Sequence, residues 1–315
     1  MKRKTDVIVV GELNVDLILD KIESLPETGK EKLAEKMSLT LGSSSAIFAS
    51  NLSSLGLNVS FVAKAGNDVF GDFCEDRLNE KGVDTSMLIR EDGLATGATV
   101  ILNFGEDRAM ITHQGAMQYL GIEDITGDML STARHLHFSS YYLQPGFRNK
   151  LDGLFKMARE AGLTTSLDMQ WDPAERWDLD FRKVLPYVDI FFPNELELLN
   201  LTGHDSIDGS LGELRKYGKC ILVKRGSQGS LLSYEDKRVA RDAFLHDQFV
   251  DAIGAGDSFN AGYIYRFLRG YSPEECQVFG NLIGAISTIR PGGTAAFTNY
   301  EETVKIAKNI FGYEE

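Results

Sequence analysis

The sequence predicts an α/β protein in which a mainly parallel central sheet lies between two layers of helices. Continuous apolar runs rich in β-branched residues, such as residues 7–10 and 220–223, are typical of strands buried on both faces. Segments with apolar residues at helical spacing occur between such runs, for example residues 69–81 and 151–161. This alternation of strands and helices favours parallel pairing through crossover helices, and therefore a three-layer α/β/α sandwich.

The composition is that of an ordinary globular protein with an acidic surface. Of the 315 residues, 43% are hydrophobic and 25% are charged, which is enough for a large core. The formal net charge of −13 argues against a nucleic-acid-binding protein. No apolar run approaches the roughly 18 residues of a membrane span, and the N-terminus lacks the pattern of a signal peptide. The three cysteines are too far apart for a disulfide framework or a metal cluster, so we expect a cytoplasmic protein without membrane partners.

The stretch from Asp251 to Asp257 (D-A-I-G-A-G-D) combines a turn of small residues with the start of a helix. Two glycines and an alanine let the backbone approach a ligand closely, and unpaired N–H groups at a helix N-terminus favour an anion such as phosphate. Asp257 is then suited to take the proton from a hydroxyl while the amides of residues 254–257 hold the transferred charge. The alternative interpretation is that Asp257 only caps the helix and the glycines only form the turn.

This Asp-x-x-Gly-Ala-Gly-Asp stretch resembles the signature of the ribokinase (PfkB) family of sugar kinases, and further family features follow in order from about residue 6 to residue 300. The resemblance implies a ribokinase-like fold and a phosphotransferase that uses ATP and magnesium to phosphorylate an alcohol group. It makes Asp257 the catalytic base and Gly254, Ala255 and Gly256 the anion hole. The chain contains no Walker A sequence, so the phosphate site is not a P-loop.

The resemblance also implies a small β-sheet lid over the sugar, which would exclude water from the reaction. Weakly alternating segments outside the strand–helix rhythm place this lid in residues 12–41 and 94–114 of a single domain, residues 1–315. A plain extension of the sheet edge is the structural alternative. A homodimer formed through the lid is the expected assembly.

The sugar site is expected at the end of the first strand and in the glycine-rich stretch that follows. Asn14 and Asp16 are two residues apart and share one face of a strand, where solvated polar residues would need no further explanation. In the family, the aspartate at this position binds substrate hydroxyls, for which an ionised carboxylate is well suited. The stretch beginning at Gly42 resembles the glycine-rich family motif, but Ser43 replaces its second glycine and Ile47 replaces an asparagine that contacts the sugar. The alternative is that this stretch only caps the following helix.

A second family loop near the sugar includes Gly115, and His113 and Gln114 beside it are candidate specificity residues. The expected substrate-binding residues are Asn14, Asp16, Gly42, Ser43, Ile47, Gly115 and Asp257.

The nucleotide side is expected around the loop that follows the strand at residues 220–223. In the family this loop lies under the phosphates and ribose, and Lys224 stands here in place of the usual threonine, where it could add charge to the phosphate contacts. Its glycines are also typical of any hairpin turn. Asn281, on a helix over 273–289, falls where the family lines the adenine pocket, and Gly280 and Gly284 would permit close approach. The expected cofactor-binding residues are Lys224, Gly226, Ser227, Gly229, Gly254, Gly256 and Asn281.

Metal sites follow from two further motifs. Asn194 and Glu197 are three residues apart and share one face of a helix, where they are either a capping pair or, as the family implies, residues that order magnesium through water. Asp251 and the Ile253 carbonyl match one side of the potassium site of potassium-activated members, and residues 290–294 match the other.

Two further pairs of polar residues have less definite roles. His135 and His137 share a strand face without a third ligand at metal spacing and are expected to be structural. Asp168 and Gln170 lie at the carboxyl end of a strand, where ligands collect in open α/β sheets, but their role stays open.

The sequence therefore predicts an ATP-dependent kinase for a small sugar that is ribose-, fructose- or keto-deoxy-sugar-acid-like. A nucleoside kinase of the same fold is the alternative, because Ile47 and Phe48 could line an apolar base pocket. A non-catalytic sugar- or nucleotide-binding protein is a third candidate, against which the intact 254–257 turn argues.

Overall fold

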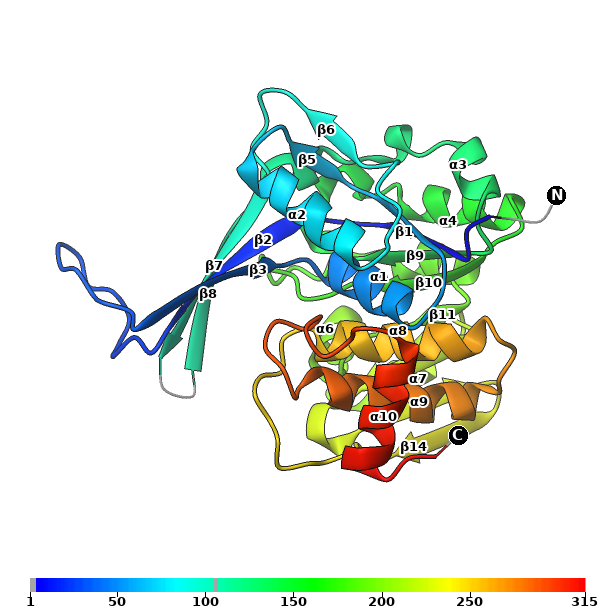
Figure 1. The fold of residues 1–315 in the computed structure, drawn as a ribbon. Helices are drawn as coiled ribbons and strands as arrows, with labels where there is room; N and C mark the ends of the chain where they lie inside the picture. Colours follow the sequence, from blue (N-terminus) through cyan, green and yellow to red (C-terminus); the bar gives the residue numbers. More distant parts are fainter. Residues whose placement is uncertain (1–3, 105–106, 315) are drawn as a thin grey trace.

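The computed structural model describes residues 4–104 and 107–314. Residues 105–106 of the predicted lid segment, and residues 1–3 and 315 of the predicted single domain, lie outside the described residues. The chain forms a layered body from which one small sheet projects (Figure 1). No helix in the described ranges is both long and apolar enough to cross a membrane.

The main sheet of the described chain has eight strands in the order β14-β13-β12-β11-β10-β9-β1-β4. From β4 to β12 all neighbours are parallel, whereas β13 and β14 add an antiparallel hairpin at one edge. This confirms the mainly parallel sheet. The glycine loop at residues 225–229 joins β12 to β13 in an antiparallel pair, which is the hairpin alternative given for these glycines, whereas the sequence did not predict β14. The strands are β1 (Val7–Val10), β4 (Val59–Val62), β9 (His135–Ser139), β10 (Thr164–Asp168), β11 (Ile190–Phe191), β12 (Cys220–Lys224), β13 (Ser230–Tyr234) and β14 (Lys237–Arg241).

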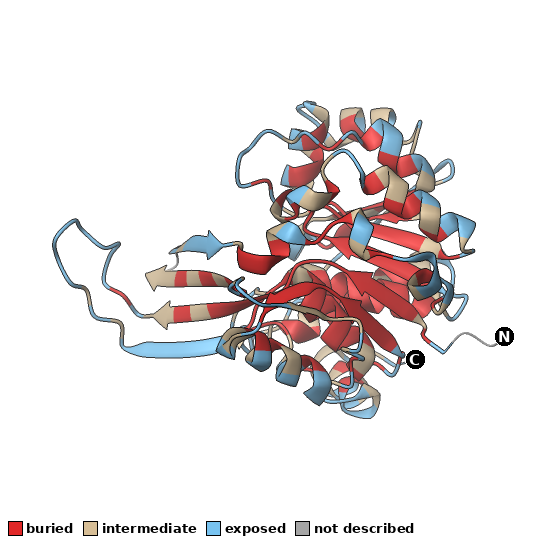
Figure 2. Cartoon of the chain, turned by 90° about the horizontal axis from the view of Figure 1, so that it is seen from above, coloured by how far each residue is buried: buried red, intermediate tan, exposed pale blue. Residues whose placement is uncertain are grey.

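Helices cover both faces of this sheet and form two separate cores, which confirms the three-layer α/β/α arrangement. Alternate residues of β1 show the division, because Val7 and Val9 pack into one core while Ile8 and Val10 pack into the other. Figure 2 shows the resulting buried central layer. The helices of the first core are α1 (Ser44–Ser54), α2 (Val69–Glu80), α8 (Ala255–Phe267), α9 (Pro273–Ser287) and α10 (Tyr300–Phe311). The helices of the second core are α3 (Gly127–Ser131), α4 (Leu151–Glu160), α5 (Phe181–Val184), α6 (Glu195–Thr202) and α7 (Ile207–Leu214).

Short elements complete the described chain. The strands β5 (Lys64–Gly66) and β6 (Ile89–Glu91) pair in parallel beside the body. The 3₁₀ turns are η1 (Gly115–Tyr119), η2 (Ile122–Asp124), η3 (Tyr141–Leu143), η4 (Pro145–Phe147), η5 (Leu185–Tyr187) and η6 (Gly226–Gln228).

The projecting sheet has the strand order β3-β2-β7-β8 and is formed by β2 (Asn14–Asp20), β3 (Lys36–Leu41), β7 (Gly97–Phe104) and β8 (Asp107–His113). Its register places a polar row on one face, in which Asp16 pairs with Thr40 and Thr99, and Thr99 pairs with Thr112. The neighbouring row points to the other face and is apolar. In this row Leu17 pairs with Leu39 and Val100, and Val100 pairs with Ile111. The sheet therefore has one mainly apolar face, whereas the other face carries this polar row next to the apolar row of Ile18, Ile101 and Met110.

Candidate active site

The glycine turn meets α8 where the sequence predicted a helix N-terminus. Gly254 is the N-cap residue with φ of 71°, a left-handed conformation that favours glycine, and the helix begins at Ala255. The amide of Ala255 donates to the Ala252 carbonyl at 3.2 Å, so this group is already engaged in the turn. The helix itself leaves the amides of its next residues, Gly256 and Asp257, without a partner. The candidate anion donors are therefore fewer than the four amides expected from the sequence.

Asp257 lies in the first turn of α8 and is buried, with 7% of its surface exposed. Gln170 Nε2 donates to Asp257 Oδ1 at 3.0 Å. Burial and the nearby Asp168 carboxylate raise the pKa of Asp257 to about 7, although Lys224 opposes this shift. A carboxyl group with this pKa can accept a proton from a substrate hydroxyl near neutral pH.

Asp168, at the end of β10, is the centre of the polar cluster. Its side chain is fully buried, and its Oδ2 accepts hydrogen bonds from Lys224 Nζ at 2.5 Å and from Asn260 Nδ2 at 2.6 Å. Gln170 Nε2 also donates to this oxygen, at 3.1 Å. The cluster thus joins β10, β12 and α8 and connects to Asp257 through Gln170.

Lys224 lies beside the glycine turn. Its Nζ would be 3.5 Å from a Cβ atom added at Gly256, so the ammonium group is near the candidate anion donors. The sequence predicted this lysine to contact phosphates, but it gave no sign of the buried ion pair with Asp168.

Asn194 and Glu197 form a closed capping box at the start of α6. The Asn194 amide N–H donates to Glu197 Oε2 at 2.9 Å, and Asn194 Nδ2 donates to Glu197 Oε1 at 2.7 Å. The Glu197 amide in turn donates to Asn194 Oδ1 at 2.8 Å. Burial, followed by the Asp168 carboxylate, raises the pKa of Glu197 to about 7. The capping interpretation is thus realised, and each carboxylate oxygen keeps one lone pair for a water of a hydrated magnesium ion.

The expected sugar ligands lie together at the base of β2. Asn14 Nδ2 donates to Asp16 Oδ1 at 2.9 Å and lies 3.2 Å from Thr99 Oγ1 on β7. A Cβ atom at Gly42 would lie 2.3 Å from Asp16 Oδ1, so only glycine fits there. Burial raises the pKa of Asp16 to about 6, and the hydrogen bond from Asn14 opposes this shift. The sequence did not predict the contribution of Thr99.

Three other expected sugar residues have evident structural roles. Ser43 has φ of 69°, and its Oγ both caps α1 at the Ala46 amide and donates to the Glu12 carbonyl. Ile47 is buried and packs against the glycine turn, where its Cγ2 would be 2.9 Å from a Cβ atom at Gly254. Gly115 has φ of 54°, and its lack of a side chain lets the backbone of residues 95–97, including the Gly97 amide, lie close to it.

Glu12 is a buried carboxyl group that acts on both Asp16 and Asp257 and that the sequence analysis missed. It hydrogen-bonds the Ser45 hydroxyl through Oε2 at 2.5 Å and the Ser45 amide through Oε1 at 3.2 Å. Burial raises the pKa of Glu12, and its charge in turn raises the pKa of both Asp16 and Asp257. Its position directly after the buried first strand was the only available signal, because the contacts with Ser45 depend on the fold.

The expected nucleotide loop follows β12, with Gly226 and Ser227 exposed and Gly229 directly before β13. Asn281 Nδ2 donates to the Asp242 carbonyl at 3.3 Å, which places this side chain beside the end of β14.

The role expected for the glycines beside Asn281 was wrong. A Cβ atom at Gly280 would lie 3.1 Å from the Phe259 ring, and one at Gly284 would lie 3.1 Å from the Ala255 carbonyl oxygen. These glycines therefore allow α9 to pack closely against α8.

The two segments expected to form a potassium site do meet. Asp251 Oδ1 accepts the Ile253 amide at 2.8 Å, and Asp251 Oδ2 accepts the Gly292 amide at 3.1 Å. Lys81 Nζ donates to the carbonyls of Thr294, at 3.0 Å, and Phe297, at 2.5 Å. Part of this loop is therefore stabilised by an ammonium group of the protein itself.

The strand histidines are buried and hydrogen-bonded to hydroxyl groups. His135 Nδ1 lies 2.8 Å from Thr164 Oγ1, while His135 Nε2 and His137 Nδ1 lie 2.7 and 2.8 Å from Ser166 Oγ. Burial lowers the pKa of His135 to about 3. Over the described ranges, no group of three or more His, Cys, Asp or Glu side chains has the arrangement of a metal site.

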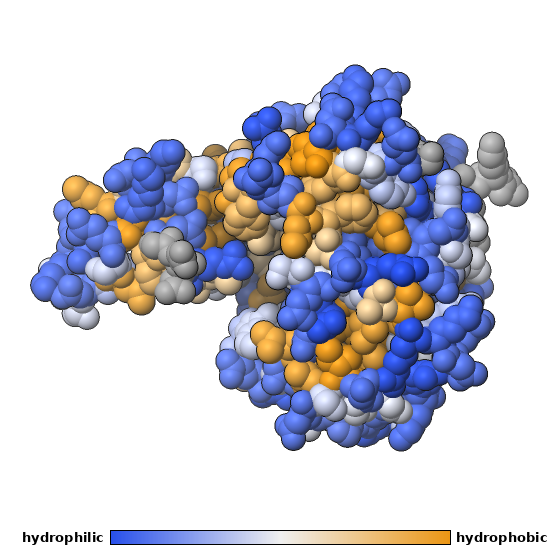
Figure 3. Space-filling model, turned by 90° about the horizontal axis from the view of Figure 1, so that it is seen from below, coloured by the Kyte–Doolittle hydropathy of each residue, from blue (hydrophilic) through white to orange (hydrophobic). Residues whose placement is uncertain are grey.

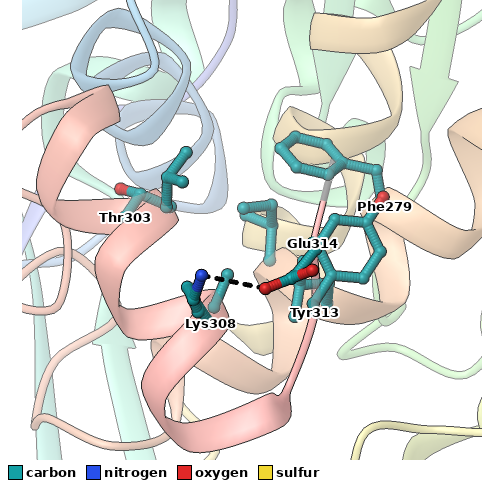
Figure 4. Close-up of a pocket in the computed structure, with 9 residues that line it drawn as sticks. Phe279, Thr303, Lys308, Tyr313 and Glu314 are labelled. Atoms are coloured by element: carbon teal, nitrogen blue, oxygen red, sulfur yellow. Dashed lines mark ion pairs between the residues drawn. The ribbon is translucent and has the colours of Figure 1, made fainter.

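A cavity of about 320 Å³ lies between α9 and α10, away from these groups (Figure 4). Phe279, Thr303 and Tyr313 contribute to its lining, and Lys308 forms an ion pair with Glu314 at 2.8 Å. Its lining does not include any of the buried carboxylates described above (Glu12, Asp16, Asp168, Glu197 and Asp257). This cavity is therefore separate from the candidate active site.

Comparison with known proteins identifies the family. The family model described as "pfkB family carbohydrate kinase" matches residues 4–299. The chain belongs to the pfkB family of carbohydrate kinases. The sequence is 27% identical to a nucleoside kinase of Methanothermobacter thermautotrophicus over 316 residues, which cover 100% of this chain and 99% of that protein.

Two solved ribokinase structures are similar to this pfkB-family kinase. A ribokinase from Thermotoga maritima superposes with a TM-score of 0.83 at 25% identity, covering 97% of this chain and 100% of the other. An Arabidopsis thaliana ribokinase, solved in complex with ribose and ATP, has a TM-score of 0.83 at 24% identity and covers 96% of this chain and 99% of that chain. These likenesses confirm the ribokinase fold. Family membership confirms the prediction of a carbohydrate kinase.

Proposed function

We propose that the protein transfers the γ-phosphoryl group of ATP to a hydroxyl group of a small sugar, with Asp257 as the catalytic base. The observation that carries this proposal is the buried Asp257 carboxylate in the first turn of α8, beside the glycine turn. The side chain of Gln170 connects this carboxylate to the Asp168–Lys224 ion pair. Asp257 removes the proton from the attacking hydroxyl. The amides of Gly254, Gly256 and Asp257 stabilise the charge on the phosphoryl group.

The residues on the phosphate side support binding of the nucleotide. Lys224 is already held beside Gly256 and contributes positive charge to the phosphates. The loop with Gly226, Ser227 and Gly229 lies under the nucleotide, and Asn281 contacts the adenine. Asn194 and Glu197 would hold the hydration shell of magnesium, which neutralises charge on the ATP phosphates. A potassium ion beside Asp251 and the Ile253 carbonyl would stabilise the glycine turn.

The residues of the sugar side support a polyhydroxylated acceptor. Asp16 accepts hydrogen bonds from two hydroxyl groups of the sugar, and Asn14 orients Asp16. Gly42 lets the sugar approach Asp16, while Ser43, Ile47 and Gly115 shape the surrounding backbone. Ribose, fructose and keto-deoxy sugar acids are the sugar candidates.

A nucleoside is the second candidate substrate, which the similarity to a nucleoside kinase over the whole chain favours. Our test is magnesium-dependent ATP consumption against pentoses, hexoses, keto-deoxy sugar acids and nucleosides, with and without potassium. Turnover on one compound class confirms the proposal and identifies the substrate class. Binding of ATP without turnover on any compound would contradict it and favour a non-catalytic sugar- or nucleotide-binding protein.

The projecting sheet supports a lid formed by residues 12–41 and 94–114, and a homodimer through that lid. Its apolar face includes Met37 and Ile111, which are 70% and 69% exposed, and hydrophobic surface is visible on the projecting sheet in Figure 3. A second copy would bury this face. We expect a dimer by light scattering and a monomer for Met37→Glu; a monomeric wild-type protein would contradict the proposal.

Three free, buried cysteines support a reducing, cytoplasmic location.

A further inference from the structure

The segment after β10 contains an unusual concentration of left-handed backbone. Gln170, Glu175 and Trp177 have φ values of 61°, 52° and 53°, a backbone region that residues other than glycine rarely adopt. The Asp172 carboxylate holds this segment by accepting the backbone N–H groups of residues 174, 176 and 177. Such conformations cost free energy and persist where the surrounding structure fixes them, often at functional sites.

The conformation of Gln170 brings its side-chain amide between two carboxylates. Nε2 donates one hydrogen to Asp168 Oδ2 at 3.1 Å and the other to Asp257 Oδ1 at 3.0 Å. Ionised carboxylates only accept hydrogen bonds, so the NH₂ group of Gln170 is the part of the amide that can join both. Asp168 is itself fixed by Lys224 and Asn260, and it provides a rigid anchor for Gln170.

We propose that Gln170 is a positioning residue that orients the Asp257 carboxylate for proton abstraction from the acceptor hydroxyl. This inference rests on the proposed function and deepens it. The bond to Oδ1 fixes the rotamer and plane of the carboxylate, while the strained backbone and the bond to Asp168 fix Gln170. The pattern Asp168-x-Gln170, to which the sequence assigned no role, thereby acquires one.

Gln170 also stabilises the ionised form of Asp257, because a hydrogen bond to a carboxylate favours its charge. The charged groups that act on Asp257 come from several elements. Asp168 on β10 and Glu12 after β1 raise its pKa, whereas Lys224 on β12 lowers it. Glu197 on α6 also interacts with Asp257. Removal of the Gln170 amide leaves these charges in place, so the pKa of Asp257 should rise.

The experiment compares Gln170→Leu and Gln170→Gly with Glu175→Gly. The leucine variant removes the amide while keeping similar bulk, and the glycine variant removes it while relieving the left-handed backbone. Glu175 is exposed and also has a left-handed backbone in the same segment, so Glu175→Gly is a control for backbone relief alone. We expect both Gln170 variants to lose about 10- to 100-fold in kcat at pH 7 with little change in KM for ATP, because a misaligned base affects the transition state.

The pH dependence separates positioning from a merely structural role. The acid limb of kcat should move to higher pH in both Gln170 variants, so that part of the rate returns at high pH. The ¹³C carboxyl resonance of Asp257, assigned by its loss in Asp257→Asn, should titrate at correspondingly higher pH. An unchanged midpoint in both variants would overturn the proposal, as would kcat within twofold of wild type. Absence of turnover by the wild type would contradict the kinase function instead, and the resonance would still test the contact.

Discussion

The phosphate side and the sugar side of the candidate site are built in different ways. On the phosphate side, Asp257, Gln170, Asp168 and Lys224 form one connected, buried network from three elements of the body. On the sugar side, the expected ligands Asn14 and Asp16 lie on the projecting sheet and interact with each other and with Thr99.

We infer from this difference that the phosphate side determines the rate of phosphoryl transfer and that the sugar side determines which substrate binds. The phosphate-side groups are fixed before any ligand arrives, as phosphoryl transfer requires, because its catalysis consists mainly of positioning and charge stabilisation. The sugar side has few preformed contacts, so small changes on the sheet can alter which hydroxyl compound binds. We therefore expect substitutions on the phosphate side to affect kcat and substitutions on the sugar side to affect KM for the sugar.

The largest effect is expected from Asp257→Asn. Loss of the base should lower kcat by about three orders of magnitude, while ATP affinity stays within a few fold because the base acts in the transition state. Turnover in single-turnover kinetics and ATP binding by calorimetry measure the two quantities. Near-normal turnover would remove Asp257 from the role of base.

A smaller effect on the same step is expected from Lys224→Met. Loss of the ammonium group beside the glycine turn should lower kcat by roughly 100-fold. It also leaves the Asp168 carboxylate buried without its cation, which destabilises the fold. The double variant Lys224→Met/Asp168→Asn removes both charges and is the control for stability. If that variant regained wild-type kcat, Lys224 would have no role in the reaction.

Asp16→Ala should have the smallest effect on the chemical step. We expect KM for the sugar to rise about 10- to 100-fold through lost hydrogen bonds to a charged group, with a minor change in kcat. Leu17→Ala, on the opposite face of the same strand, should leave KM for the sugar near its wild-type value. Unchanged sugar affinity of Asp16→Ala in calorimetry would place the sugar elsewhere.

The sequence predicted the parts of this site that depend on short segments. The turn at 251–257 and the pair Asn194 and Glu197 are local patterns whose geometry follows from helix N-termini. The parallel sheet was likewise evident from buried runs such as residues 7–10. The two-faced projecting sheet was only partly evident, since its alternation is weak.

The contacts that connect these parts could not be predicted, because they join residues far apart in the chain. Lys224 pairs with Asp168 across 56 positions, and Asn260 reaches the same carboxylate across 92. The left-handed conformation of Gln170 is equally hidden, since glutamine has no local preference for it. Gly280 and Gly284 show the opposite case, in which a recognisable pattern allowed close approach of a helix instead of a ligand.

The pH dependence of wild-type kcat/KM tests the role of Asp257 most directly. The carboxylate must be ionised to accept a proton, and burial together with Asp168 raises its pKa to about 7. We therefore expect log kcat/KM, which reports the ionisation of the free enzyme, to be level above pH 7 and to fall with a slope near one below it, whereas the residual kcat/KM of Asp257→Asn should lack this limb. A wild-type rate that stays level down to pH 5 would contradict the account.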